Sequence, residues 1–173
     1  MSETPKPPEN PLEIYKIYRD YVEHEDALIH HRTTSLITIQ SFLIATFGFA
    51  YQKSYEIAEK LLSRDTSVKP ATLGNITDEY NLFLLILAIV GLGTSIIAWR
   101  SIVAATKAIK GLKEKWNNLK FQNPVNHLPG LTGGGDEKVT EAGLSLSIRA
   151  PQLFIALWVL IILLILVKIW LKS

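Results

Sequence analysis

The sequence predicts an all-α fold, that of an integral membrane protein with three transmembrane helices and helical extensions on the cytoplasmic side. The chain has 173 residues, of which 48% are hydrophobic. It is too short and too apolar to hold a large soluble domain in addition to a membrane part. Three uncharged apolar runs approach or reach the roughly 20 residues that cross a bilayer as a helix. The segments between these runs keep apolar residues at helical spacing.

The amino-terminal part divides into a tail and a juxtamembrane helix. Residues 1–10 are Pro-rich and polar and predict a disordered tail. Residues 11–34 predict an amphipathic helix, because Pro11 suits a first helical turn and apolar residues recur three to four positions apart. No breaker separates this helix from the first span, so one helix is expected to run through both.

The first predicted span, residues 35–51, is the weakest of the three. It has about 17 residues, near the lower limit for crossing, and it includes Gln40 and several hydroxyl side chains. A buried helix of a soluble protein is the alternative interpretation. The absence of charge between Arg32 and Lys53 favours the span.

The second span and its flanks follow from the same reasoning. Residues 52–79 predict an external loop with a short helix, and residues 80–99 predict a span with Tyr80 and Trp99 at its ends. Residues 100–121 continue as a cytoplasmic amphipathic helix, whose apolar residues recur every three to four positions with lysines on the opposite face. Two asparagines at 117 and 118, or Asn123-Pro124, are the expected stop signals.

The last part of the chain joins an irregular segment to the clearest span. Residues 122–150 contain Pro124, Pro129 and three consecutive glycines, and they predict an irregular linker. Residues 151–171 predict the third span, uncharged from Leu153 to Val167. A tryptophan and lysines stand at its carboxyl-terminal end, as in an interfacial anchor.

Lys and Arg counts predict the orientation. Twelve of these residues lie in 1–34 and 100–150, and six lie elsewhere, four in 52–79 and two at the carboxyl-terminal tail, Lys168 and Lys172. Because positive residues are retained in the cytoplasm, the amino terminus is expected inside, with the chain in the cell inner membrane.

Charge and composition exclude several classes of function. A formal net charge of +2 gives no strong field for nucleic acid, so no nucleic-acid partner is expected. The chain has no cysteine, which excludes disulfides, thiolate catalysis and cysteine metal sites. No cofactor motif is recognisable. The expected partners are the lipid bilayer and either further copies of the chain or another membrane protein.

Small residues in the first two spans predict helix packing. Lipid gives no hydrophobic drive for helix association, so close approach over small residues and hydrogen bonds must supply it. The expected packing positions lie one or two turns apart on each helix, and they are Thr38, Ser41 and Gly48 in the first span and Ala88, Gly91 and Ser95 in the second. Gln40 is the most polar group at membrane depth and should face a helix partner or water. The third span has no comparable row of small residues along one face, and it is interpreted as a lipid-facing anchor.

The segment YVEHEDALIHHR just before the first span is the densest ionisable stretch. Its predicted role is a juxtamembrane polar network made by Glu23, His24, Asp26, His30, His31 and Arg32. A solvated, salt-bridged helix face is the main alternative. Glu23, Asp26 and His30 are weak candidates for metal ligands, because they lie on one helix face at spacings of three and four residues. One helix supplies too few ligands, and no metal site is predicted.

Two segments carry a resemblance. EHEDALIHHRTTSLITIQSFLIATFGF, residues 23–49, and LPGLTGGG, residues 128–135, resemble parts of an uncharacterised family of small bacterial multi-pass membrane proteins. The resemblance implies a membrane location and no activity. In architecture alone, the chain also resembles membrane effectors of bacterial antiviral systems.

Three functions from different classes are compatible with these features. The first is a non-catalytic membrane anchor or assembly subunit that presents cytoplasmic helices to a partner. The second is an oligomeric pore-forming or channel-like effector, as in bacterial antiviral defence, for which Gln40 and the small-residue positions argue. The third is an interfacial metalloenzyme built on the His/Asp/Glu stretch. No catalytic residues are predicted, and the first function is preferred.

Overall fold

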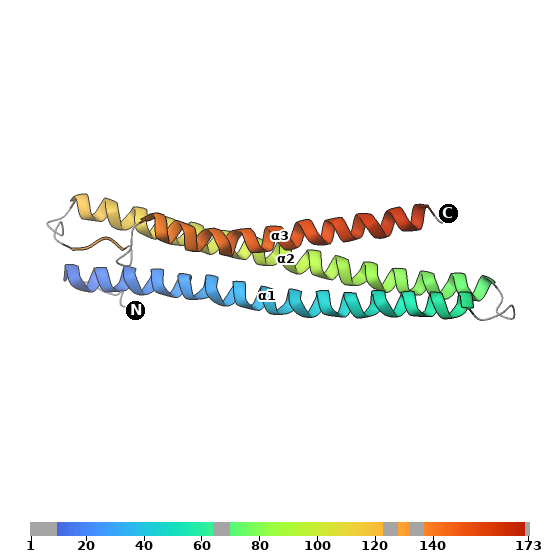
Figure 1. Ribbon diagram of the computed structural model, residues 1–173. Helices are drawn as coiled ribbons and strands as arrows, with labels where there is room; N and C mark the ends of the chain where they lie inside the picture. The colour runs from blue at the N-terminus through green and yellow to red at the C-terminus, as the bar shows by residue number, and fades with distance from the viewer. Residues whose placement is uncertain (1–9, 64–69, 123–127, 132–136, 172–173) are drawn as a thin grey trace, which may run out of the picture. The chain divides into compact units, whose positions relative to one another are not determined.

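A computed structural model describes residues 10–63, 70–122, 128–131 and 137–171. It contains three helices, α1 (Pro11–Ser63), α2 (Pro70–Gln122) and α3 (Glu137–Trp170) (Figure 1). The prediction of an all-helical chain is confirmed for these residues. Each helix contains a stretch that is long and apolar enough to cross a membrane, which confirms the three candidate spans.

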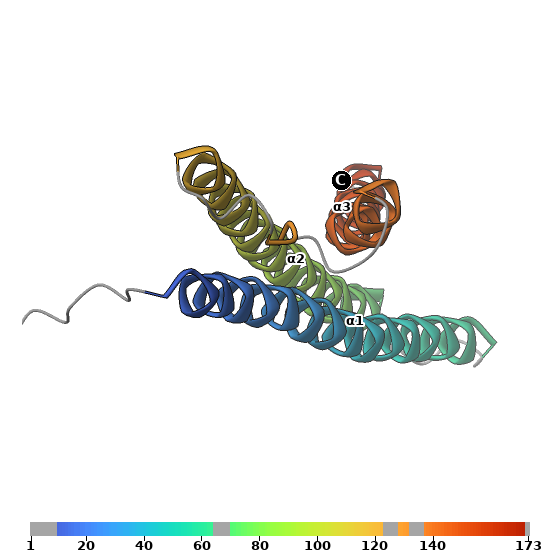
Figure 2. The same ribbon diagram turned by 90° about the vertical axis from the view of Figure 1, so that its left-hand side faces the viewer.

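The chain forms two compact units. Unit 1 comprises Met1–Thr33 and Arg100–Ile148, and unit 2 comprises Thr34–Trp99 and Arg149–Ser173. Each of the three helices, which Figure 2 shows from a second direction, contributes residues to both units. Unit 2 holds the uncharged runs of the sequence, and unit 1 holds most of the charged residues.

Local sequence signals explain where the helices begin and end. Asn10 caps α1, since its side-chain Oδ1 accepts a hydrogen bond from the Leu12 amide at 3.1 Å. Pro11 and Pro70 each occupy a first helical position, where the missing N–H costs nothing. α2 ends at Gln122, one residue before the Asn123-Pro124 dipeptide.

The helices are longer than the sequence predicted. α1 extends to Ser63 and α2 begins at Pro70, so most of the expected external loop 52–79 is helical. α3 begins at Glu137, which corrects the expectation of an irregular linker over 122–150 for its last fourteen residues. The reason is that no proline falls between Glu137 and Pro151, and Ile148 packs on the core of unit 1.

Pro151 was expected in the first turn of a span, but it lies inside α3 and is fully buried. Its ring removes one backbone hydrogen bond from the helix. Prolines are tolerated at such positions in membrane helices because neighbouring groups satisfy the freed carbonyl.

Unit 1 has an apolar core with two centres. Ile29 of α1 packs on Ile102, Ala105 and Ile109 of α2. The second centre places Trp116 against the rings of Tyr15 and Tyr18, with centroid distances of 5.4 and 5.8 Å, and against Leu128 and Leu131. The α2 residues of the first centre recur at helical spacing, whereas Leu128 and Leu131 of the second lie outside the helices.

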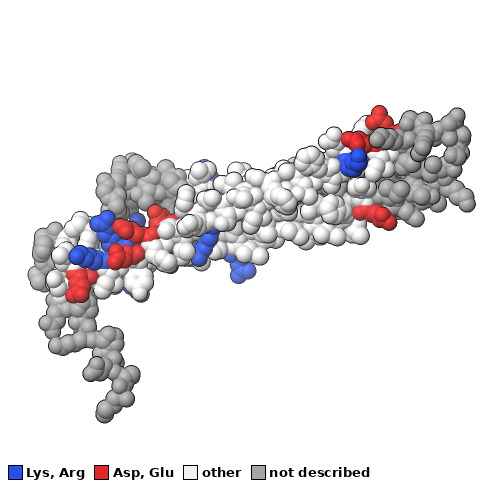
Figure 3. All heavy atoms as spheres, turned by 90° about the horizontal axis from the view of Figure 1, so that it is seen from below, with Lys and Arg blue, Asp and Glu red and all other residues white. Residues whose placement is uncertain are grey.

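Unit 2 packs all three helices around one core but leaves a wide apolar surface. Leu43, Ala88 and Trp158 are its buried centre, one from each helix. Large hydrophobic side chains remain exposed around it, and Phe42 is 70% and Phe49 74% exposed in the chain. Figure 3 shows a surface without Lys, Arg, Asp or Glu over the uncharged runs on the face drawn. A surface of this composition is typical of a protein in contact with lipid.

Candidate functional site

The most organised polar group in unit 2 is a cluster around Gln40, which we call the Gln40 cluster. Its members are Gln40 of α1, Gly91, Thr94 and Ser95 of α2, and Trp158 of α3. Gln40 is fully buried, as are Ser95 and Trp158. The cluster therefore joins all three helices at one level of unit 2.

Hydrogen bonds at this site satisfy both ends of the Gln40 amide. The oxygen Oε1 accepts from the Trp158 indole N–H at 2.6 Å. The nitrogen Nε2 lies 2.9 Å from Ser95 Oγ, 3.0 Å from Thr94 Oγ1 and 3.2 Å from the Gly91 carbonyl oxygen. Because an indole N–H only donates, the amide oxygen must face Trp158, and this fixes the orientation of the side chain.

The hydroxyl groups in the cluster are satisfied as well. Ser95 Oγ donates to the Gly91 carbonyl at 2.7 Å, and Thr94 Oγ1 lies 3.0 Å from both the Val90 and Gly91 carbonyls. Each hydroxyl can therefore donate to its own helix and accept from Gln40 Nε2. The donors and the acceptor of the Gln40 amide all have partners, so no unpaired polar group of this side chain is exposed to an apolar environment.

Gly91 permits the approach of α3 to α2. A Cβ built on Gly91 would overlap the Trp158 ring, at Cε2, Nε1 and Cζ2. By contrast, a Cβ on Gly93 or Gly48 would meet nothing within 4 Å. The indole therefore lies directly on the backbone of α2, and only glycine leaves room for it.

The structure separates the six predicted packing residues into two groups. Ala88, Gly91 and Ser95 of α2 are buried in unit 2. Thr38, Ser41 and Gly48 of α1 are exposed within the chain. The side of α1 that packs carries Leu36, Gln40 and Leu43 instead, so packing through the α1 stripe stays a prediction about contacts between chains.

The exposed hydroxyls of α1 do not need a partner helix. Thr38 Oγ1 donates to the Thr34 carbonyl at 3.0 Å, and Ser41 Oγ donates to the Ile37 carbonyl at 2.8 Å. Such bonds to the preceding turn satisfy the hydroxyl inside its own helix. A polar-looking stripe can therefore face lipid without an unpaired donor.

The juxtamembrane residues lie in unit 1, and the structure brings few of them into contact with each other. Glu23 accepts a hydrogen bond of 2.7 Å from Arg19, one turn away on α1. This bond and the negative charge of Glu23 raise the pKa of Arg19 above its ordinary value. Arg32 Nη1 donates to the Ser101 carbonyl of α2 at 3.0 Å.

The remaining members of the predicted network are solvent-facing. His24, Asp26, His30 and His31 are exposed, and the rings of His30 and His31 lie 6.4 Å apart. Over the described ranges, no group of three or more His, Asp and Glu is placed to hold a metal ion, and this includes Glu23, Asp26 and His30. The juxtamembrane polar network therefore stays a prediction, and the exposure of these four side chains is compatible with a solvated helix face.

The sequence interpretation missed Trp158. The third span was interpreted as a lipid-facing anchor, yet Trp158 is fully buried and donates to Gln40. A signal was available: membrane tryptophans concentrate at the interfaces, whereas Trp158 lies in the middle of its apolar run. A central tryptophan needs an acceptor for its N–H, and Gln40 was the available buried amide.

Comparisons with protein-family models, with curated proteins and with solved structures found no match to this chain. The chemistry of the site is therefore taken from its geometry alone. The Gln40 cluster contains amide, hydroxyl and indole groups, which are uncharged at neutral pH and form hydrogen bonds between the helices of unit 2.

Proposed function

We propose that this chain is a non-catalytic integral membrane protein in which unit 2 anchors the chain in the cell inner membrane and unit 1 presents cytoplasmic helices to a partner protein. The observation that carries the proposal is the internal satisfaction of the Gln40 cluster. Its polar groups bond to one another across three helices of one chain.

The pairing of these polar groups within one chain favours an anchor over a pore. A pore lined by Gln40 would need that amide to face water, whereas the side chain is fully buried against α2 and α3. A three-helix unit with a paired polar centre and an apolar outer surface is stable in lipid without further subunits.

The chemistry of unit 1 supports the presenting role. Its helices have their own apolar core and an exposed surface rich in charged side chains, and Tyr21 and His31 are exposed on it as well. Exposed residues of this kind suit reversible contacts with another protein at the membrane surface.

One observation favours the alternative, an oligomeric pore-like effector. Thr38, Ser41 and Gly48 form an exposed small-residue stripe on α1, where a second copy of the chain has room for close approach. The self-satisfied hydroxyls on that stripe reduce the need for such a contact.

Cysteine labelling tests the membrane anchor and its orientation. The chain has no native cysteine, so Ser63→Cys and Asn118→Cys each introduce a single thiol. An impermeant thiol reagent should label the first from outside the cell and the second only after the membrane is opened. The reverse pattern would refute the proposed orientation, and labelling of both in released soluble protein would refute the anchor.

Oligomeric state and ion flux distinguish the anchor from the pore. Native mass spectrometry from lipid nanodiscs should give no closed ring of copies, and liposomes containing the protein should retain their ions. Gln40→Ala serves as the matched variant, because removal of a pore-lining amide would alter conductance. A ring together with a conductance that changes in this variant would establish the pore instead.

Photocrosslinking tests the presenting role directly. A photoreactive amino acid at exposed position 31 of unit 1 should give adducts with another protein in cells, whereas one at Phe42 of unit 2 should give lipid adducts. Protein adducts at position 42 alone would place the partner contact on unit 2 and contradict the proposal.

A further inference from the structure

Unit 2 contains a pocket of about 400 Å³ between its three helices, separate from the Gln40 cluster. Its volume falls in the range of small-molecule sites, about 300–1,000 Å³. The floor is apolar and is formed by side chains such as Phe47, Leu84, Ile161 and Leu164. Three polar side chains, Tyr51, Asn81 and Lys168, complete the lining.

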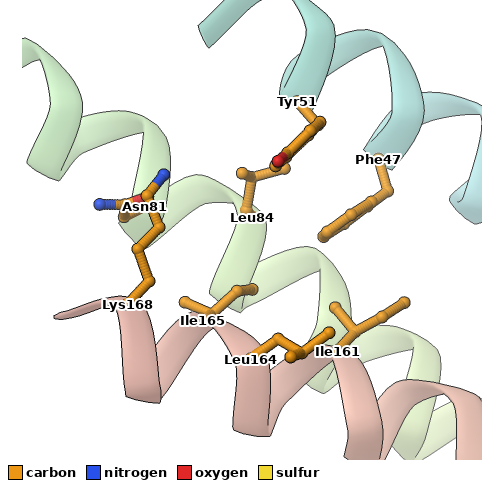
Figure 4. Close-up of a pocket in the computed structure, with 8 residues that line it drawn as sticks. All are labelled: Phe47, Tyr51, Asn81, Leu84, Ile161, Leu164, Ile165 and Lys168. Atoms are coloured by element: carbon orange, nitrogen blue, oxygen red, sulfur yellow. The ribbon is translucent and has the colours of Figure 1, made fainter. Parts of the chain in front are cut away.

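The polar and apolar parts of this pocket are segregated. Figure 4 shows Lys168 reaching Asn81 at one end, with Ile161 and Phe47 towards the other. Ile161 and Lys168 are seven residues apart on α3, which corresponds to about 10 Å along the helix. A ligand that fills the pocket therefore needs a polar end and an apolar body about two helical turns long.

The polar end coincides with the ends of the uncharged runs. Lys168 is the first charged residue after the run of α3, Asn81 stands at the start of the run of α2, and Tyr51 stands near the end of the run of α1. In the proposed membrane, this end lies at the interface with water and the apolar end lies in the hydrocarbon. A bilayer lipid has the same orientation, with its head group at the interface and its chains inward.

Lys168 determines the charge of the head group that fits. It is the one charged residue among the pocket's described lining residues, and Asp78 and Glu79 just before Asn81 do not line it. Lys168 Nζ lies 3.4 Å from Asn81 Oδ1 in a long hydrogen bond. An ammonium group has three donors, so Lys168 can hold Asn81 and a phosphate oxygen together.

We infer that this pocket is a binding site for an anionic phospholipid, with one acyl chain against Phe47, Ile161 and Leu164 and the phosphate at Lys168. The site rests on the proposed membrane location of unit 2 and not on the presenting role of unit 1. Basic residues between membrane helices recognise anionic head groups in this way.

Lipid titration measured by native mass spectrometry tests the site. Protein purified and freed of lipid is titrated with dioleoyl phosphatidylglycerol and, separately, with dioleoyl phosphatidylethanolamine, which has the same chains and no net charge. The parent protein should bind phosphatidylglycerol with about fivefold higher affinity than phosphatidylethanolamine, which is the effect expected of one basic residue near an anionic group. Lys168→Gln should abolish this preference, and Lys168→Arg should keep it.

Lys53→Gln is the matched control, since Lys53 is an exposed lysine of unit 2 that does not line the pocket. It should leave the preference unchanged. An equal loss in Lys53→Gln and Lys168→Gln would reduce the effect to general surface charge and overturn the site. Displacement of phosphatidylglycerol by an equal concentration of oleate would assign the pocket to a free fatty acid and overturn the phospholipid.

Crosslinking locates the acyl chain. Phosphatidylglycerol with a photoreactive group on its chain should form adducts with residues 161–165 of α3, and unlabelled phosphatidylglycerol should suppress them. Chain-to-chain adducts from a photoreactive residue at position 164 would show a second copy in the pocket and overturn the proposal. Alkaline carbonate extraction is done first: release of the protein refutes the membrane anchor, whereas retention without lipid preference refutes the lipid site alone.

Discussion

Units 1 and 2 use the same three helices, yet different interactions hold their centres together. At the centre of unit 1, Ile29, Ile102 and Ala105 are buried against one another, and the buried polar residues among those described all lie in unit 2. At the centre of unit 2, a buried amide bonds to two neighbouring helices. The difference matches the solvent proposed for each, because water drives apolar burial and lipid does not.

The two buried tryptophans show the same contrast. Trp158 of unit 2 donates its N–H to Gln40, whereas Trp116 Nε1 is the buried side-chain donor without a partner among the described residues. Trp116 is held by the rings of Tyr15 and Tyr18 and by apolar neighbours. In unit 1 the indole contributes mainly buried apolar surface area, and in unit 2 it also contributes a hydrogen bond of defined direction.

The largest effect is expected in the apolar core of unit 1. Ile102→Ala removes a fully buried side chain and should lower the stability of unit 1 by about 2–5 kcal/mol. Hydrogen exchange of unit 1 amides is the measurement. Leu146→Ala, at an exposed position of the same unit, should change protection little. Equal losses in both variants would contradict a core formed at Ile102.

The next effect concerns the close approach at Gly91. Gly91→Ala adds a Cβ that overlaps Trp158 and should destabilise unit 2 by about 1–3 kcal/mol, measured by unfolding in mixed detergent micelles. Gly93→Ala adds a Cβ in open space on the same helix. It should be neutral, or stabilising by up to about 1 kcal/mol through helix propensity. If the two variants behave alike, the indole does not lie on the α2 backbone.

A double-mutant cycle sharpens the role assigned to the polar bond. Gln40→Leu leaves the Trp158 N–H unpaired, and Trp158→Phe leaves the Gln40 oxygen unpaired. The coupling between the two changes should be about 0.6 kcal/mol and at most about 1.7 kcal/mol, the average and the maximum for hydrogen bonds between membrane helices. Additive effects in the cycle would mean that the bond contributes nothing beyond packing.

The smallest effect is expected at the solvated face of α1. His30→Ala combined with His31→Ala should leave membrane insertion intact and change stability by less than about 0.5 kcal/mol, because both rings are exposed. Thermal unfolding and zinc titration of the parent and the double variant are the measurements. Stoichiometric zinc in the parent that is lost in the variant would restore the metal interpretation.

Apolar run length and periodicity predicted the three helices, since both are properties of single segments. The partners of Gln40 depend on which faces meet, and one sequence does not specify this. On α2, the small residues Gly91 and Ser95 were predicted to pack against another helix, and both are buried. On α1, however, the same signal pointed to the exposed face with Ser41, because self-bonded hydroxyls make a lipid-facing stripe look like a packing stripe.

The extended helix ends were missed for a different reason. The segment from Glu137 to Arg149 has no long apolar run, and its proximity to Pro129 and the three glycines suggested an irregular linker. Its helix is stabilised in part by the contact of Ile148 with the core of unit 1. Such a contact between distant parts of the chain overrides local propensity.

The separation of the Gln40 partners along the chain has a consequence for biosynthesis. Ser95 follows Gln40 by 55 residues and Trp158 follows it by 118, so the acceptor on Gln40 is filled last. At about 5–20 residues per second, the ribosome adds those 118 residues in roughly 6–24 s. For that interval α1 carries an amide oxygen that its own chain cannot yet pair. A nascent chain stalled before Trp158 should therefore stay beside the insertion machinery, and one stalled well after it should move into the bilayer.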